Sequence, residues 1–140
     1  MVGTVQDVTL PARFLTLVGH LIVTLTVLYD SESVVRNAIG RDGTGFSGKK
    51  DELEGYAWAS VVCFAVEFAL TLTGVSLFLP KVTSFYILAH FVGLVLVALF
   101  CGDKWGLDWF PVLFFLFSAL PTAVEATVAV LVLKFRILEY

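Results

Sequence analysis

The segment YAWASVVCFAVEFALTLTGVSLFL (Tyr56–Leu79) decides the fold class of this protein. A bilayer-spanning helix needs about 20 mostly apolar residues, and this run is long enough to be one. Near its centre stands Glu67, a carboxylate whose neighbours are almost all apolar. The same Ala-Val-Glu sequence returns at Glu125. Because an acid inside a membrane is costly, both glutamates are candidates for a specific role.

The composition of the whole chain indicates a membrane protein. Of its 140 residues, 59% are hydrophobic and only 15% are charged, with a mean hydropathy of +0.93. Soluble domains are nearer half apolar and a quarter charged. The net charge of −3 argues against a nucleic-acid partner, which would require a basic face. We predict an all-α, four-helix membrane bundle forming a single domain (1–140), with helices at about 12–29, 56–79, 82–101 and 109–133.

The predicted helices form two hairpins, with a long polar loop at 30–54 and two short links. Short links are typical of antiparallel neighbours, so we expect the second helix to pack against the third, and the third against the fourth. An even number of spans places both termini on one side of the membrane. The terminal side has four Lys and Arg residues and the other side has five, so this count does not decide the orientation in the membrane. The acids of the loop side favour cytoplasmic termini. The terminal-side cations are Arg13, Lys81, Lys134 and Arg136.

Four ionisable side chains fall inside the predicted spans: His20, Glu67, His90 and Glu125. A charge at the bilayer centre costs about 2.5–3.5 kcal/mol, so such groups normally face the bundle interior and find partners. Their neighbours on the same helix faces are small or polar, which lets membrane helices approach and hydrogen-bond. We expect both acids to face other helices, with a histidine as the first-choice partner. The supporting small or polar side chains are Ser60, Thr71, Gly74, Ser118 and Thr122.

Three interpretations of these buried groups are open. A metal site is one, but no helix carries the Glu-x-x-His pair of di-iron bundles, and we predict no metal or other cofactor. A proton relay is the second, although four unbroken helices are unlike a transporter. The favoured one is a structural hydrogen-bond network that fixes helix register, with each acid protonated or paired with a histidine. On that interpretation, Gln in place of either acid preserves the packing, and Leu weakens it.

The sequence also shows a weak internal repeat. The first and third predicted helices each carry a mid-span histidine, and the second and fourth each carry Ala-Val-Glu with a serine seven residues before the acid. Two parallel hairpin repeats would produce this pattern.

The polar loop contains a near match to a phosphate-binding motif. GTGFSGKK (Gly43–Lys50) approaches the pattern G-x-x-x-x-G-K-[ST], but Lys50 replaces the hydroxyl that binds magnesium, and no strand precedes it. Its glycines are typical of a flexible loop. No constellation of nucleophile, base and acid stands outside the predicted spans, so we predict that the protein is not an enzyme.

Three strings carry a resemblance to a known family: PARFLTLVGHLIV (Pro11–Val23), CFAVEFALTLTGVSLF (Cys63–Phe78) and FSALPTAVE (Phe117–Glu125). In this order and spacing they resemble the transmembrane protein 107 family, four-span proteins of the ciliary transition zone. The resemblance covers nearly the whole chain, and only the first loop looks divergent.

The resemblance implies a subunit of the Meckel syndrome module, a membrane assembly at the cilium base that forms a diffusion barrier and supports cilium assembly. It implies partners among multi-span, tectonic-type and B9-domain proteins of the transition zone, besides membrane lipid, and it supplies no catalytic residues. Two alternatives stay open: a small proton-coupled transporter or channel, and a lipid-binding protein that shapes its membrane. An interior path from Glu67 and Glu125 to both faces would favour transport, and a dry, packed interior would favour a scaffold.

Overall fold

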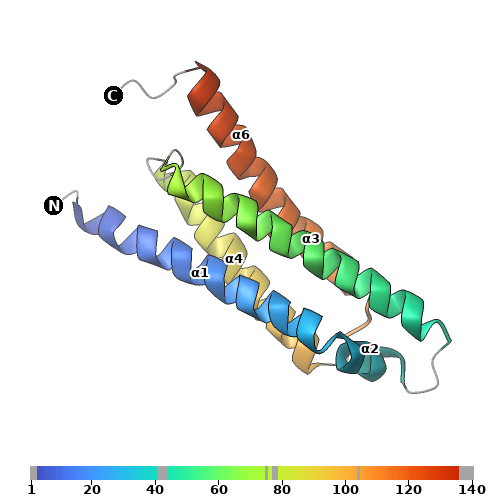
Figure 1. The fold of residues 1–140 in the computed structure, drawn as a ribbon. Coiled ribbons are helices and arrows are strands. Elements are labelled where there is room, and N and C mark those ends of the chain that lie inside the picture. Colours follow the sequence, from blue (N-terminus) through green and yellow to red (C-terminus); the bar gives the residue numbers. More distant parts are fainter. Residues whose placement is uncertain (1–2, 41–43, 75, 77–78, 104, 136–140) are drawn as a thin grey trace.

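The computed structural model describes residues 3–40, 44–74, 76, 79–103 and 105–135, and its regular elements over these residues are all helices (Figure 1). Four helical stretches are long and apolar enough to cross a membrane, which confirms the predicted all-α, four-span fold class. The elements are α1 (Gly3–Tyr29), α2 (Ser31–Ile39), α3 (Phe46–Leu72), α4 (Pro80–Gly102), α5 (Trp109–Phe114), the π-helical segment η1 (Phe115–Ala119) and α6 (Leu120–Phe135).

The predicted polar loop at 30–54 is largely helical in the structure. It contains α2, and α3 begins at Phe46, well before the Tyr56 that hydropathy predicts. Ion pairs between neighbouring turns support this polar start of α3: the Lys50 Nζ atom lies 3.7 Å from Glu54 Oε1, one turn further on. Hydropathy detects only the apolar part of a helix, so it missed the part that extends beyond the membrane.

At its other end, α3 stops at Leu72, short of the predicted Leu79. The chain turns at Gly74, whose φ of 76° lies in the left-handed region that glycine adopts without strain. Gly74 was predicted to lie on a helical stripe with Glu67, and the structure places it in this turn instead. The connection to α4 therefore runs from Thr73 to Leu79 and is longer than the predicted two-residue link.

The four spans form a ring in which α1 packs between α3 and α4, and the α5–η1–α6 helix completes the circuit. This helix packs on α3 along α5, η1 and α6, and on α4 along α5 and η1. Among the described residues, α3 and α4 have at most marginal backbone contact, so the prediction that they pack as neighbours is wrong. The longer connection lets the chain cross the bundle, and the two diagonals are α3 with α4 and α1 with α6.

The helices α1 and α4 make the most extensive contact of any two elements. A Cβ atom added at Gly93 would lie 2.4 Å from His20 Cε1 and 2.8 Å from Phe117 Cβ. One added at Gly19 would meet only the end of the Leu94 side chain, at 2.5 Å. Small residues at such crossings are how membrane helices come close enough to pack.

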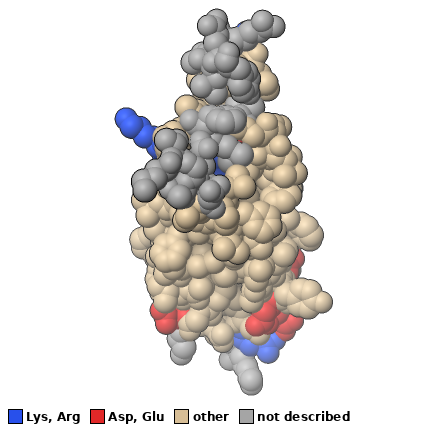
Figure 2. All heavy atoms as spheres, turned by 90° about the vertical axis from the view of Figure 1, so that its left-hand side faces the viewer, with Lys and Arg blue, Asp and Glu red and all other residues tan. Residues whose placement is uncertain are grey.

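The end of the bundle near α2 has an apolar interior. Its buried core draws on every span and on α2, and it contains Val27, Val35, Leu53, Ala57, Val97, Phe100, Phe110 and Leu113. Figure 2 shows a broad band without charged side chains on the viewed face, with acidic and basic residues gathered at its lower end. The chain begins and ends at the other end of the bundle, as an even number of spans requires (Figure 1).

We predict that Gly93→Ala destabilises the bundle by about 1–3 kcal/mol, the range for overpacked interiors, because Phe117 Cβ cannot move without its backbone. The measurement is unfolding of the purified protein in lipid nanodiscs. Gly55→Ala is the control: no atom lies within 4 Å of the added Cβ, so that variant should be unchanged or slightly stabler. If Gly93→Ala and Gly55→Ala lowered the unfolding free energy equally, the close packing around Gly93 would be contradicted.

Candidate functional site

A chain of polar side chains crosses the middle of the bundle and links all four spans. We call His20, Glu67, His90 and Thr122 the central cluster. The Nδ1 atoms of His20 (α1) and His90 (α4) lie 3.3 Å apart, close enough for one to donate to the other. His90 Nε2 lies 2.7 Å from Glu67 Oε2 (α3), and Glu67 Oε1 lies 2.6 Å from Thr122 Oγ1 (α6). Glu67 and both histidines are only 1% exposed.

The fourth span reaches this cluster through a local change of helix type. Pro121 has no backbone N–H, so an α-helix here would lose one of its hydrogen bonds. The structure has the π-helical segment η1 just before this proline, and the Leu120 N–H donates to the Phe115 carbonyl, five residues earlier. Ser118 is buried within η1, and its carbonyl lies 2.8 Å from Thr122 Oγ1. The π-helical segment thus ends shortly before Thr122, the residue that contacts Glu67 of α3.

A second group of polar side chains lies nearer the chain termini. We call Arg13, Ser76, Tyr86 and Glu125 the terminal cluster. Arg13 Nη2 lies 3.0 Å from Glu125 Oε1, and Arg13 Nη1 donates to Ser76 Oγ at 2.8 Å. The Ser76 hydroxyl donates in turn to Glu125 Oε1 at 2.6 Å. The Arg13 guanidinium also sits over the Tyr86 ring, 4.3 Å from its centroid, in a cation–π contact.

Arg13 is the residue that sequence reasoning missed. It was counted among the terminal-side cations that set membrane orientation, whereas the structure places it inside the bundle, 2% exposed. Its ion pair gives Glu125 an arginine as partner in place of the expected histidine, and Gln at position 125 would leave a buried guanidinium unpaired. In the structure α1 begins at Gly3 and its apolar span at Val8, so the span extends further toward the N-terminus than the predicted residue 12 and includes Arg13. Propensity gave no sign of this, because Pro11 directly precedes Ala12 and Arg13.

The supporting residues differ in what they contact. Ser60 is buried, and its hydroxyl donates to the Tyr56 carbonyl of its own helix at 3.0 Å. The Thr71 hydroxyl is buried and makes no hydrogen bond in the structure. Of the five supporting residues that the sequence suggested, Thr122 belongs to the central cluster, and the Ser118 carbonyl accepts from Thr122. Gly74 lies in the turn that follows α3.

Both clusters join helices that face each other diagonally. Glu67 and His90 join α3 to α4, and Arg13 and Glu125 join α1 to α6. Neither diagonal pair packs backbone against backbone in the part of the chain that the structure describes, so polar side chains bridge them across the centre. Toward α2, the apolar core closes the interior. The central and terminal clusters therefore occupy one half of the bundle, between its middle and the end that carries the termini.

An apolar groove of about 320 Å³ runs between α1 and α3 on the side of the bundle. Phe14, Leu17, Phe64 and Phe68 contribute to its lining, and the Phe14 and Phe68 rings lie 5.9 Å apart. Phe64 separates the groove from the central cluster, because its ring packs 4.7 Å from that of His20. The groove is thus suited to hydrocarbon and does not lead to the buried acids.

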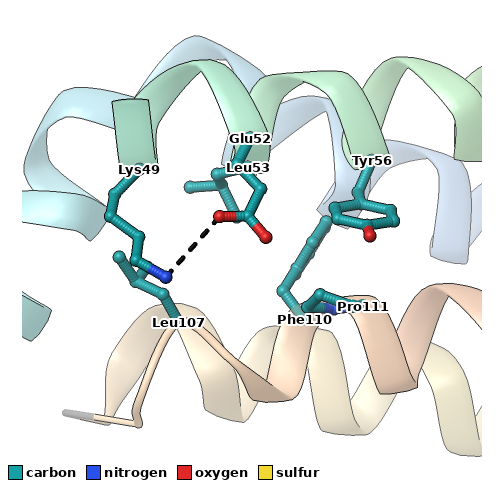
Figure 3. A pocket seen from close by; sticks show the side chains of 7 residues that line it. All are labelled: Lys49, Glu52, Leu53, Tyr56, Leu107, Phe110 and Pro111. Atoms are coloured by element: carbon teal, nitrogen blue, oxygen red, sulfur yellow. Dashed lines mark ion pairs between the residues drawn. The ribbon is translucent and has the colours of Figure 1, made fainter. Parts of the chain in front are cut away.

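Other arrangements suggested by the sequence do not form a site. Among the described residues, no three His, Cys, Asp or Glu side chains are arranged to hold a metal ion. Lys49, from the near match to the phosphate loop, pairs with Glu52 at 3.5 Å and with Asp108 at 3.3 Å. Figure 3 shows Lys49 and Glu52 beside Leu107 and Phe110, where the start of α3 meets the segment that leads into α5. The charged side chains of Lys49, Glu52 and Asp108 are exposed, and their ion pairs connect two surface segments.

We predict that Arg13→Met and Glu125→Leu each destabilise the protein strongly, by about 3–5 kcal/mol, because each leaves a buried charge without its partner. The double variant should lose less than either single variant, since it removes both charges together. Unfolding of the four proteins in lipid nanodiscs measures this coupling. Additive losses in the double variant would contradict a buried ion pair.

The exposed ion pairs of Lys49 provide the control. Lys49→Ala should leave the unfolding free energy nearly unchanged, because water and salt screen exposed charges. A loss as large as that of Arg13→Met would show that the method does not distinguish buried from exposed pairs.

Comparisons with known proteins show which family the chain belongs to. The family model described as TMEM107: Transmembrane protein matches residues 9–129. Transmembrane protein 107 of Homo sapiens is 32% identical over 124 residues, which cover 87% of this chain and 89% of the human protein. The Xenopus laevis protein of the same name is 29% identical over 128 residues, 90% of this chain and 91% of its own length. No solved structure matches significantly. The chain therefore belongs to the transmembrane protein 107 family.

Proposed function

We propose that the protein is a scaffold subunit of the ciliary transition zone, where it helps to form the membrane diffusion barrier and supports cilium assembly. Membership in the transmembrane protein 107 family is the observation that carries this proposal, since the resemblance covers all four spans and implies this assembly. The proposed partners are multi-span, tectonic-type and B9-domain proteins of the Meckel syndrome module. In this role the protein binds and positions other proteins and catalyses no reaction.

The interior of the bundle supports a scaffold over a transporter or channel. A transport path must reach both faces of the membrane, and the buried acids would have to lie on it. The polar clusters lie between the middle of the bundle and its terminal end, whereas the apolar core around Val27, Leu53 and Phe100 closes the end near α2. Phe64 likewise separates the central cluster from the lateral groove. The polar groups thus join helices without lining a path across the bundle.

The outer surface supports contact with other membrane components. Large apolar side chains are exposed along the spans, among them Leu15, Ile22, Leu88 and Leu133. In a membrane these side chains face lipid or the helices of partner proteins. The groove between α1 and α3 offers an additional concave apolar surface, which also suits the alternative of a lipid-binding protein that shapes its membrane.

We expect Glu67→Gln to preserve localisation at the cilium base and recovery of partners, and Glu67→Leu to weaken both. Gln keeps the hydrogen bonds to His90 and Thr122, whereas Leu removes contacts of a kind that average about 0.6 and reach about 1.7 kcal/mol in membranes. Microscopy and proximity labelling in ciliated cells, at matched expression, measure both properties. A proton relay gives a different result: Gln cannot carry a proton and would be as harmful as Leu. Wild-type protein absent from the cilium base would overturn the proposed function.

We also propose that both termini are cytoplasmic. The family resemblance and the acids of the loop side support this orientation. The cation count opposes it, because the burial of Arg13 leaves Lys81, Lys134 and Arg136 on the terminal side against five cations on the other. If the termini are cytoplasmic, a glycosylation acceptor inserted between α2 and α3 is modified in cells, and the same acceptor at the N-terminus is not. Modification at the N-terminus alone would reverse the orientation.

A further inference from the structure

Four polar contacts run in series through the central cluster, and each is a full hydrogen bond only if a proton lies between its two atoms. The Ser118 carbonyl lies 2.8 Å from Thr122 Oγ1, which lies 2.6 Å from Glu67 Oε1. Glu67 Oε2 lies 2.7 Å from His90 Nε2, and His90 Nδ1 lies 3.3 Å from His20 Nδ1. The Ser118 carbonyl can only accept, so the series has a fixed direction at that end.

The side chains cannot supply these protons if Glu67 is ionised and both histidines are neutral. The Thr122 hydroxyl has one proton, and each neutral imidazole has one on its ring nitrogens, while a carboxylate has none. Three protons are then available for four contacts. One contact would bring two acceptor atoms together without a proton, and such an unsatisfied contact is costly in a buried site.

We propose that the central cluster binds one additional proton and that Glu67 carries it, so that Glu67 is a neutral carboxylic acid while Glu125 is an ionised carboxylate. The four contacts are then all hydrogen bonds. His20 Nδ1–H donates to His90 Nδ1, and His90 Nε2–H donates to Glu67 Oε2. Thr122 Oγ1 lies within donor distance of both Glu67 Oε1 and the Ser118 carbonyl. With Glu67 protonated, it accepts from the Glu67 carboxyl O–H and donates its one proton to the Ser118 carbonyl.

Placing the additional proton on His90 gives a poorer arrangement. His90 would then donate to both Glu67 and His20, and Thr122 would donate either to Glu67 or to the Ser118 carbonyl, but not to both. One of the four contacts would again lack a proton. This arrangement would also separate a positive and a negative charge in an apolar interior, where ion pairs recover their desolvation cost poorly.

The charges around the cluster agree with a neutral Glu67. Seven ionisable or acidic groups of the described residues face one another in this half of the bundle: Arg13 and His20 on α1, Cys63 and Glu67 on α3, Tyr86 and His90 on α4, and Glu125 on α6. Arg13 is always protonated, and its direct ion pair with Glu125 cancels one charge of each sign. An ionised Glu67 would leave a net negative charge inside the membrane, and the additional proton removes it.

Glutamine substitutions at the two glutamates provide a matched test of stability. A glutamine amide resembles a protonated carboxyl group: it donates through nitrogen and accepts through oxygen. Glu67→Gln should therefore leave the thermal unfolding midpoint in lipid nanodiscs at neutral pH close to that of the wild type. Glu125→Gln should lower it clearly, because the Arg13 charge loses its partner. If Glu67→Gln lowers the midpoint as much as Glu125→Gln does, Glu67 is ionised and the proposal is wrong.

Infrared spectroscopy tests the proton directly and does not depend on the folding of Glu125→Gln. The wild type in nanodiscs at neutral pH should show the carbonyl band of a protonated carboxylic acid, shifted by exchange into D2O. The band should vanish in Glu67→Gln and persist in the Arg13→Gln/Glu125→Gln double variant, which removes the neighbouring ion pair. Absence of the band in the wild type, its persistence in Glu67→Gln, or its loss in the double variant would each overturn the assignment. The proposal concerns the chemistry of the bundle and does not depend on the proposed function.

Discussion

Water is missing from the interior of a membrane, and this constraint organises the bundle. A polar side chain there has only the protein as a source of hydrogen-bond partners. Glu67 finds its partners in His90 and Thr122, and Glu125 finds its partners in Arg13 and Ser76. Each acid thereby connects a pair of helices whose backbones do not pack together. Apolar packing joins neighbours around the ring, and the polar contacts tie the ring across its two diagonals.

The two halves of the interior have different physical characters. Near α2, aliphatic and aromatic side chains fill the space between the helices, and their contacts are not directional. Toward the termini, hydrogen bonds and an ion pair fix specific atoms against one another, as where Arg13 contacts Ser76 and Glu125. Directional contacts fix the register of one helix against another. Packing between lipid-like side chains is not directional and fixes that register poorly. A bundle built this way presents a constant outer surface to its surroundings.

The two glutamates show how little a local sequence context decides about charge. Both follow an Ala-Val pair, and both are 1% exposed. Glu67 faces an imidazole and a hydroxyl, while Glu125 faces a guanidinium. A hairpin repeat would have given each acid an equivalent partner, and the structure does not. The difference comes from Arg13, which precedes His20 in the first span. The residue at the same spacing before His90 in the third span is a threonine, Thr83.

The sequence by itself determined the membrane environment, the four spans and the inward position of polar groups, because these depend on composition along one helix at a time. Hydropathy could not determine where helices end outside the membrane, so it missed α2 and the polar start of α3. Only the tertiary structure decided which helices are neighbours, since the turn at Gly74 lets α3 and α4 lie on a diagonal. It alone decided that Arg13 pairs with Glu125, because that contact joins the first span to the last. Such a pairing depends on how four helices rotate and tilt against one another, which no single segment specifies.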